Sequence, residues 1–295
     1  MGLVPAQVFS PKTRLLFVFA HQDDELPCAG LMHRAPPGSR FLWVSNGDGL
    51  AEAAGMSQAE YGRLRRDETI RAMAIEGVGE DRLRFLGHSE VAIYKALVRL
   101  AREPRSAHEV LQMFRDMAAH VGAEIRAYRP DVVFTLAWQG GHPVHDLVHC
   151  MVRAALPAEV ALYEVPEYEL AYTILLRFPP WRKAPVHKIR LTTEEMEIKR
   201  QMFEVYRTQS EGLKRFRSLV SACQAVAALG GKPFGFEEYV ATEEFGPVPA
   251  DRDYSRSPHI VDFLDYIGDD CDGMPIRFSR MVAPVASAIL ARQRA

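Results

Sequence analysis

The sequence predicts an α/β fold, a Rossmann-like and mostly parallel sheet sandwiched by helices. Residues 15–20, 41–45 and 131–136 form short apolar runs that are bounded by charged or turn-forming residues. Runs of this kind are typical of parallel strands that are buried on both faces. Segments with a helical pattern lie between them, and strands that alternate with helices predict a parallel, doubly wound sheet.

Each apolar run begins and ends at a recognisable signal. The run at 15–20 follows basic residues and leads into a polar, acidic segment. The run at 41–45 leads into Asn-Gly-Asp-Gly, which marks a loop. An Arg-Pro pair precedes the run at 131–136. Residues 84–86 and 161–163 are shorter strand candidates.

Three helix starts carry the capping-box pattern, a Ser or Thr followed three residues later by Glu. The pattern occurs at 57–60, 106–109 and 192–195. The first helix is expected to end near Gly77 and the third near Arg207. Apolar residues at spacings of three and four predict that the second helix packs on the core; they are Leu111, Phe114, Ala118, Val121 and Ile125.

Beyond about residue 210 the alternation weakens, because glycines and prolines interrupt the chain at short intervals. We therefore expect residues 1–210 to form the α/β domain. Residues 211–295 are expected to form an irregular C-terminal extension that packs on the same domain.

The composition excludes several classes of partner. The 36 Lys+Arg balance 38 Asp+Glu without any block of like charges, which argues against nucleic acid and against an anionic membrane. The apolar run at 15–20 is too short for a signal segment or a membrane span. We expect a cytoplasmic protein with reduced thiols, because the cysteines form no closely spaced pair; they are Cys28, Cys150, Cys223 and Cys271.

Two loops rich in imidazole and carboxylate groups follow predicted strands. Residues 20–25 (Ala-His-Gln-Asp-Asp-Glu) follow the first strand, and residues 140–146 (Gly-Gly-His-Pro-Val-His-Asp) come shortly after the strand at 131–136. Because the carboxyl ends of parallel strands lie on one edge of a sheet, both loops should line one crevice.

Together the two loops offer the donor set of a catalytic zinc site. Two or three imidazoles with one carboxylate suit Zn²⁺, and a catalytic site keeps one position open for water. A second carboxylate can accept the proton of that water, and a histidine off the metal can protonate a leaving amine. Fe²⁺, Co²⁺ or Ni²⁺ could occupy the same donors. The residues that supply this set are His21, Asp23, Asp24, His142 and His145.

Other interpretations of these residues stay open. Each acid or histidine taken alone could be an ordinary loop residue, although the pairing of the two loops favours a site. His149 lies one helical turn after His145, a spacing that can chelate a metal, but we favour a helix-surface or core-edge histidine. Cys28 and Cys150 are interpreted as small buried hydrophobes and not as soft ligands.

The two loops resemble the signatures of a known family, the PIG-L/LmbE-type zinc-dependent N-acetylglucosaminyl deacetylases. Residues 20–25 resemble its AHPDDE signature and residues 140–146 its GHPDHD signature. Residues 46–49 look like its turn after the second strand, and residues 65–68 look like the start of its RxxE helix. The resemblance covers roughly residues 14–165 and implies a Rossmann-like α/β sandwich.

The resemblance implies a role for each residue of the site. His21, Asp24 and His145 match the zinc ligands of the family, and Asp23 matches the general base that activates the water. His142 matches the histidine that stabilises the oxyanion and protonates the departing amine.

The chain departs from the family pattern at two positions. Gln22 stands where the family has proline, a change that the turn should tolerate. Val144 replaces an aspartate that orients or tunes the catalytic histidine, so we expect His142 to have another partner, with Asp146 as the candidate. The resemblance also matches Arg65 to an arginine that contacts the substrate.

These residues predict a metal-dependent hydrolase that removes an N-acetyl group from an amino-sugar-containing small molecule. The alternatives are a hydrolase of another small amide, such as a thiol conjugate, and a degenerate member that binds metal or sugar without turnover. A nucleotide-binding module is disfavoured, because carboxylates occupy the loop where a GxGxxG pattern would bind a pyrophosphate. Aromatic candidates for stacking on a sugar, for which core packing is the commoner role, are Tyr168, Tyr172, Trp181 and Phe236.

Overall fold

The computed structural model describes residues 5–169, 175–229 and 235–291 of the chain. Its centre is a mixed, mostly parallel seven-stranded sheet with the order β3-β2-β1-β4-β5-β7-β6, which confirms the predicted fold class. The strands are β1 (Leu15–Phe19), β2 (Arg40–Ser45), β3 (Leu83–His88), β4 (Val132–Leu136), β5 (Ala161–Val165), β6 (His187–Arg190) and β7 (Thr242–Pro247).

The apolar runs form the middle of this sheet. All residues of β1 and β4 are buried, as expected for strands that are covered on both faces. Phe17 lies in register with Phe41 of β2 and Phe134 of β4, and its ring stacks on theirs at centroid distances of 5.2 and 4.9 Å. Aromatic pairs of this kind contribute roughly 0.5–1.5 kcal/mol each beyond the burial of area.

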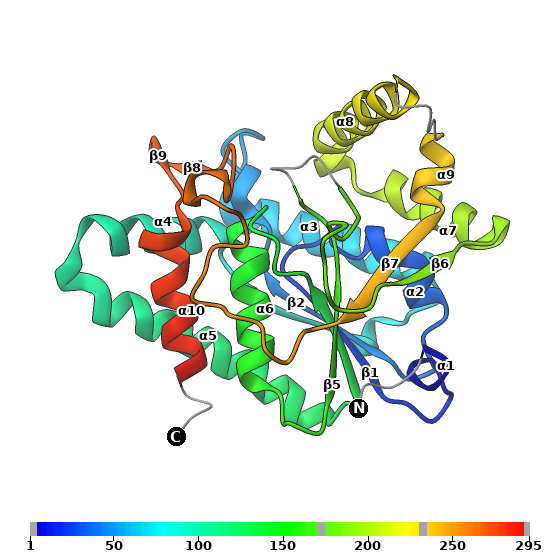
Figure 1. Ribbon diagram of the computed structural model, residues 1–295, viewed down its shortest axis with the longest axis horizontal. Helices are drawn as coiled ribbons and strands as arrows, with labels where there is room; N and C mark the ends of the chain where they lie inside the picture. Colours follow the sequence, from blue (N-terminus) through cyan, green and yellow to red (C-terminus); the bar gives the residue numbers. More distant parts are fainter. Residues whose placement is uncertain (1–4, 170–174, 230–234, 292–295) are drawn as a thin grey trace.

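Helices cover both faces of the sheet (Figure 1). On one side lie α4 (Glu90–Arg102), α5 (Ala107–Tyr128), α6 (Pro143–Ala155) and α10 (Ala283–Leu290). On the other side lie α2 (Ala29–His33), α3 (Gln58–Ile75) and α7 (Thr193–Val205). The remaining elements are α1 (Pro5–Val8), α8 (Ser210–Leu229), α9 (Phe236–Val240) and a hairpin of β8 (Asp270–Cys271) with β9 (Met274–Pro275).

Two of the three predicted capping boxes are confirmed and one is wrong. The side chains of Ser57 and Thr192 each accept a bond from the N–H of the third helical residue, a glutamate whose carboxylate accepts from the backbone N–H of the cap. At Ser106 no capping bond forms. A preceding 3₁₀ turn holds Ser106 in helical geometry, and its hydroxyl donates to the Glu103 carbonyl instead. Glu109 bonds Arg99 rather than the helix start.

The chain beyond residue 210 has more regular structure than its glycines and prolines indicate. Strand β7 lies between β5 and β6, antiparallel to both, and α10 packs on α5 and α6. The irregular part is residues 248–269, which contain one short 3₁₀ turn. The extension therefore adds a strand to the sheet and a helix to one of its faces.

None of the helices in the described parts of the chain has the length and apolar character to cross a membrane; a cytoplasmic location stays a prediction. The thiols of Cys28, Cys150 and Cys271 are free. Cys28 and Cys150 are fully buried in the core, which confirms their interpretation as small hydrophobes. The side chain of Cys223 lies outside the described residues.

Candidate metal centre and active site

The carboxyl ends of β1 and β4 bring the two predicted loops together. His21 follows β1 directly, and His145 lies in the first turn of α6. Their side chains are almost fully buried, and His21 Nδ1 lies 3.2 Å from His145 Nε2. Residues 124 positions apart in sequence thus meet at one edge of the sheet, as the parallel strand pattern requires.

Asp24 supplies a third donor between the two imidazoles. Its Oδ1 lies 3.2 Å from His145 Nε2, and its Oδ2 lies 3.7 Å from His21 Nδ1. The backbone N–H groups of Ala20 and His21 donate to Oδ2 at 2.9 and 2.6 Å. Ligands at zinc distances in a tetrahedron lie roughly 3.4 Å apart, so these three side chains have the spacing that one ion requires.

The outward nitrogen of each imidazole faces a buried carboxylate. Glu90 Oε1 lies 3.2 Å from His21 Nε2, and Glu167 Oε2 lies 3.7 Å from His145 Nδ1. Neither approach has the alignment of a full hydrogen bond, and His21 Nε2 and Glu167 Oε1 are buried without a bonding partner among the described residues. Carboxylates in this position orient metal-binding histidines in many proteins.

These observations fit a divalent metal held by His21, Asp24 and His145. Two overlapping groups in the described parts of the chain could hold an ion, His21 with His142 and His145, and Asp24 with His145 and Glu167. Both contain His145, but neither contains His21, Asp24 and His145 together, so this ligand set stays a prediction. Imidazole nitrogen with carboxylate oxygen is a donor set that zinc accepts.

The charges of the site favour a cation. Burial raises the pKa of Asp24, but His145 and His21 outweigh it and hold that pKa below its usual value. Burial likewise opposes ionisation of Glu90, yet His21 lowers the pKa of Glu90 to about 2. Burial and the neighbouring His21 and His145 rings keep the pKa of His142 well below its usual range. Two ionised carboxylates therefore accompany the imidazoles at neutral pH.

Asp23 is held beside the metal donors in an unusual backbone conformation. Its φ is 99°, a left-handed region that costs a non-glycine residue roughly 1–2 kcal/mol. Its N–H donates to Glu25 Oε2 at 3.1 Å, and its Oδ1 accepts from Arg65 at 3.0 Å. Burial raises the pKa of Asp23 to about 6, although Arg65 opposes this shift. A carboxylate with this pKa is suited to accept a proton near neutral pH.

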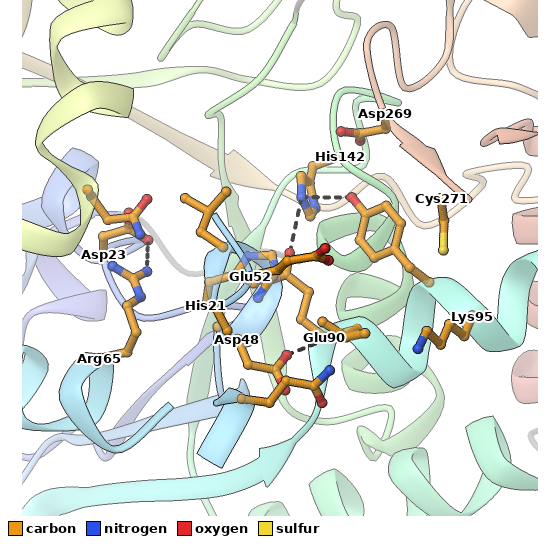
Figure 2. A pocket seen from close by; sticks show the side chains of 18 of the residues that line it. His21, Asp23, Asp48, Glu52, Arg65, Glu90, Lys95, His142, Asp269 and Cys271 are labelled. Atoms are coloured by element: carbon orange, nitrogen blue, oxygen red, sulfur yellow. Dashed lines mark hydrogen bonds and ion pairs between the residues drawn. The ribbon is translucent and has the colours of Figure 1, made fainter. Parts of the chain in front are cut away.

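Arg65 lies behind Asp23, at the edge of the pocket (Figure 2). Its guanidinium donates to Asp23 Oδ1, to the Gln22 carbonyl and to Thr208 Oγ1. Glu68 fixes Thr208 in turn, with bonds to its N–H and hydroxyl. The contacts present in the structure thus orient the carboxylate of Asp23, while contact of Arg65 with a substrate stays a prediction.

His142 is the N-cap residue of α6 and faces the pocket from the side opposite to Asp23 (Figure 2). The expectation that Asp146 pairs with it is wrong. Asp146 accepts from the N–H groups of Gln139 and Gly140 and from the Tyr266 hydroxyl, so it shapes the loop instead. The bonding partner of His142 is Tyr94, whose hydroxyl lies 3.1 Å from Nε2.

Glycines allow this loop to turn close to its neighbours. Gly140 has a φ of 70°, which glycine adopts without the steric cost of a side chain. A Cβ at Gly141 would collide with the backbone carbonyl of Tyr168. The segment that carries Glu167 and Tyr168 can therefore approach the histidines.

A pocket of about 950 Å³ opens over these groups. His21, Asp23, Asp24, His142 and His145 all line it. Of the aromatic candidates only Tyr168 does so, with its ring 5.2 Å from that of His145. Trp181 is 57% exposed at a different hollow, Phe236 lies near Arg217 in the region of α8 and α9, and Tyr172 lies outside the described residues.

His149 is not placed as a ligand, as favoured, although it is a satisfied histidine of the core and not of the helix surface or core edge. It is fully buried, its Nδ1 donates to the Leu136 carbonyl at 2.7 Å, and its Nε2 lies 2.9 Å from the Tyr254 hydroxyl. Because both ring nitrogens have partners away from the site, the alternative of a chelating pair with His145 is not supported.

The sequence gives little signal for four polar residues of the site. Glu90 and Tyr94 lie on α4. The Asp48 carboxylate supports the start of this helix, since it accepts from Ser89 Oγ and from the Val91 N–H. Glu167 follows β5, the one position that the rule of carboxyl strand ends could have found. Asp269 reaches the pocket from the C-terminal extension.

Comparisons with known proteins give a family match over the part of the chain that contains both loops. Residues 16–156 match the model of the PIG-L family, which is described as GlcNAc-PI de-N-acetylase. No significant match was found among curated proteins.

Several solved structures share the fold at low sequence identity. The A40926 pseudoaglycone deacetylase Dbv21 is 21% identical with a TM-score of 0.55, over 80% of this chain and 97% of that one. The zinc-inhibited form of teicoplanin deacetylase Orf2 is 18% identical with a TM-score of 0.54, over 82% and 100%. N,N'-diacetylchitobiose deacetylase from Pyrococcus horikoshii is 17% identical with a TM-score of 0.53, over 82% and 86%.

The similarity to these solved structures is one of fold and covers most of the chain. The match to the family model is one of sequence, and the matched residues include both loops of the site. Residues 16–156 of this chain therefore belong to the PIG-L family.

Proposed function

We propose that this protein is a metal-dependent hydrolase that removes the N-acetyl group from an amino-sugar-containing small molecule and releases acetate. The observation that carries this proposal is the meeting of His21, Asp24 and His145 at 3.2–3.7 Å, with Asp23 and His142 on two sides of the same pocket (Figure 2). A binding module without chemistry would not need this pair of proton-transfer groups.

The chain's own residues have distinct roles in this reaction. A bound zinc ion would act as a Lewis acid toward the acetyl carbonyl and would lower the pKa of a water molecule. Asp23, which Arg65 keeps in place, accepts a proton from the attacking water. His142 stabilises the oxyanion as it develops and protonates the departing amine. Positioned general acids and bases commonly contribute roughly 10²–10⁴-fold each.

An amino sugar fits the pocket by size and by composition. The volume of about 950 Å³ lies at the upper end of the range of small-molecule sites, which is roughly 300–1,000 Å³. Tyr168 offers a ring face next to the metal donors, and Arg65 is the candidate for a polar contact with the substrate. Two of the solved proteins of this fold are named as deacetylases of the A40926 pseudoaglycone and of N,N'-diacetylchitobiose.

Zinc is the proposed metal, because the donor set is of the His₂-carboxylate type that catalytic zinc sites use. The structure of a teicoplanin deacetylase of this fold in a zinc-inhibited form makes the amount of metal part of the test. Protein stripped by a chelator should be inactive. Its activity should recover when one equivalent of Zn²⁺, Co²⁺ or Fe²⁺ is added. The ion that restores the highest activity is the preferred one.

The central test uses Asp23→Asn, with N,N'-diacetylchitobiose and a small panel of other N-acetyl amides as probes. Release of acetate and of free amine should fall by about 10²–10⁴-fold, while metal content should stay equal to that of the unmodified protein. Asp116→Asn, the same change on the exposed surface of α5, should leave both unchanged.

Near-normal activity in Asp23→Asn would show that the base is misassigned. Hydrolysis of simple amides but of no sugar amide would favour the amidase alternative. Metal binding without hydrolysis of any probe by the unmodified protein would favour the degenerate, non-catalytic alternative.

A further inference from the structure

The loop and the helix start that carry His142 offer its ring no polar partner of their own. Val144, the helical neighbour two positions along, is 1% exposed and has no polar side-chain atom. Asp146 is committed to the backbone of the loop and to Tyr266. Among the described residues His142 Nδ1 is buried without any bonding partner, so the orientation of the ring depends on what contacts Nε2.

Two side chains of α4 approach Nε2. The Tyr94 hydroxyl lies 3.1 Å away, within hydrogen-bonding distance. Glu90 Oε1 lies 3.7 Å away, too far for a hydrogen bond, and its other oxygen accepts from the Gly49 N–H. Tyr94 is therefore the residue that fixes the ring by a direct bond.

The C-terminal extension places a carboxylate next to this contact. Burial and the nearby Asp269 carboxylate raise the pKa of the Tyr94 hydroxyl well above its usual value, and Asp269 lies beside His142 at the upper rim of the pocket (Figure 2). The backbone of Asp269 is fixed at both ends, since its N–H donates to the Tyr266 carbonyl and its carbonyl accepts from Ile276.

Tyr266 ties this segment to the loop of His142. Its N–H donates to the Gly140 carbonyl at 2.6 Å, and its hydroxyl donates to Asp146 at 2.8 Å. The loop that carries His142 and the segment that carries Asp269 are thus fastened to each other next to the bond between Tyr94 and His142.

We propose that Tyr94, with Asp269 beside its hydroxyl, is the positioning residue of His142. This inference rests on the proposed function and adds a residue pair to it. In this arrangement the Tyr94 oxygen accepts from His142 Nε2–H, and the Tyr94 O–H turns toward the Asp269 carboxylate. The tautomer of His142 with its proton on Nε2 is then the favoured one.

One test is independent of substrate and of metal. In the metal-free protein with ¹⁵N-labelled histidine, long-range ¹H–¹⁵N spectra should show His142 in the Nε2–H form, with the signal assigned by a His142→Gln variant. Tyr94→Phe should remove the fixed tautomer and give averaged ring shifts, while circular dichroism stays unchanged. Tyr128→Phe, which loses a hydroxyl bonded to the Gly38 carbonyl at the far end of α5, should leave the His142 signal as it was.

Kinetics provide the second test, with N,N'-diacetylchitobiose as the probe. Tyr94→Phe should lower kcat by about tenfold or more with KM changed by less than about threefold, because a misplaced acid affects the transition state and not ground-state binding. Asp269→Asn should give a smaller loss in the same direction, and Asp269→Glu should recover part of it.

The two tests separate the inference from the proposed function. Unmodified protein that hydrolyses no amide would refute the proposed function, while the spectra would still decide the role of Tyr94. An unchanged His142 tautomer in Tyr94→Phe, or a kcat equal to that of Tyr128→Phe in an active protein, would overturn the inference.

Discussion

At the scale of single residues, the site depends on carboxylates that have different tasks although they are neighbours in sequence. Asp24 lies between the two imidazoles, Asp23 is turned toward Arg65, and Glu25 supports the loop through Trp43 and Tyr206. Asp23 differs from its neighbours in its left-handed φ of 99°. In the proposed mechanism one loop thus supplies a metal ligand, a base and a structural acid.

Glu90 gives a prediction at this scale. Glu90→Gln removes a negative charge next to His21 Nε2 and should weaken zinc binding by about 10–100-fold, the usual effect of losing a carboxylate behind a histidine ligand. Competition with a chromophoric chelator measures this affinity. Glu80→Gln, at an exposed surface pair with Arg66, is the matched control. Equal affinities of the two variants would mean that Glu90 does not support the ligand.

At the scale of secondary structure, local sequence decides where helices begin only when no neighbouring element competes. Ser57 and Thr192 cap their helices as the pattern predicts. Ser106 has the same pattern, but a 3₁₀ turn runs directly into its helix, and Arg99 of the preceding helix binds Glu109. The pattern is a local signal, whereas the ion pair joins residues ten positions apart.

The cap of α3 gives a prediction at this scale. Ser57→Ala should lower the free energy of unfolding by about 1 kcal/mol, because the Glu60 N–H loses its acceptor at the helix start. Urea unfolding followed by circular dichroism measures the change. Ser218→Ala, the same substitution inside exposed helix α8, should have no destabilising effect, since alanine is the better helix former. A loss of the same size at both sites would contradict the capping role.

At the scale of the whole molecule, segments from several distant parts of the chain close around the histidines. The pocket is lined by the loop of β1, by helix α4, by the loop of β4 with α6, and by residues 268–272 of the segment at 257–272. His259 fastens the last of these, since Nδ1 lies 2.6 Å from Asp265 and Nε2 lies 2.5 Å from Glu169. The division of the chain at residue 210 stays a prediction. Strand β7, which lies beyond that residue, pairs with β5 and β6, which lie before it.

His259 gives a pH-dependent prediction. Burial opposes its charge, but the bonds to Asp265 and Glu169 outweigh burial and raise the pKa of His259 to about 9. In the unfolded chain a histidine has a pKa of about 6.5. The charged form of His259 therefore stabilises the fold fully below about pH 6.5, and this stabilisation is lost as pH rises through about 9. The stability difference between the unmodified protein and His259→Gln should therefore be largest at low pH and shrink toward alkaline pH.

Urea unfolding of both proteins at several pH values between about 6 and 10 covers this window. The exposed His108→Gln on α5 serves as the control and should show no such trend. A difference that stays constant with pH would mean that the charge of His259 does not contribute.

Much of the site could be predicted from local sequence. The buried runs that became β1 and β4 place the residues after them on one edge of the sheet, and this follows from the geometry of parallel strands. The pairing of His21 with His145 and the chemistry of their donors therefore needed no knowledge of tertiary contacts. The resemblance to a family added roles to residues that the pattern had already placed together.

Only the tertiary structure decided which groups surround those residues. Glu90, Tyr94, Glu167 and Asp269 come from a helix, a strand end and an extension that are distant in sequence, and no periodicity links them to the histidines. The same is true of β7, whose place between β5 and β6 depends on pairing across 82–84 residues of chain to β5 and 52–58 residues to β6. Sequence periodicity reports which face of an element is buried, whereas the partner on that face is set by packing of the whole chain.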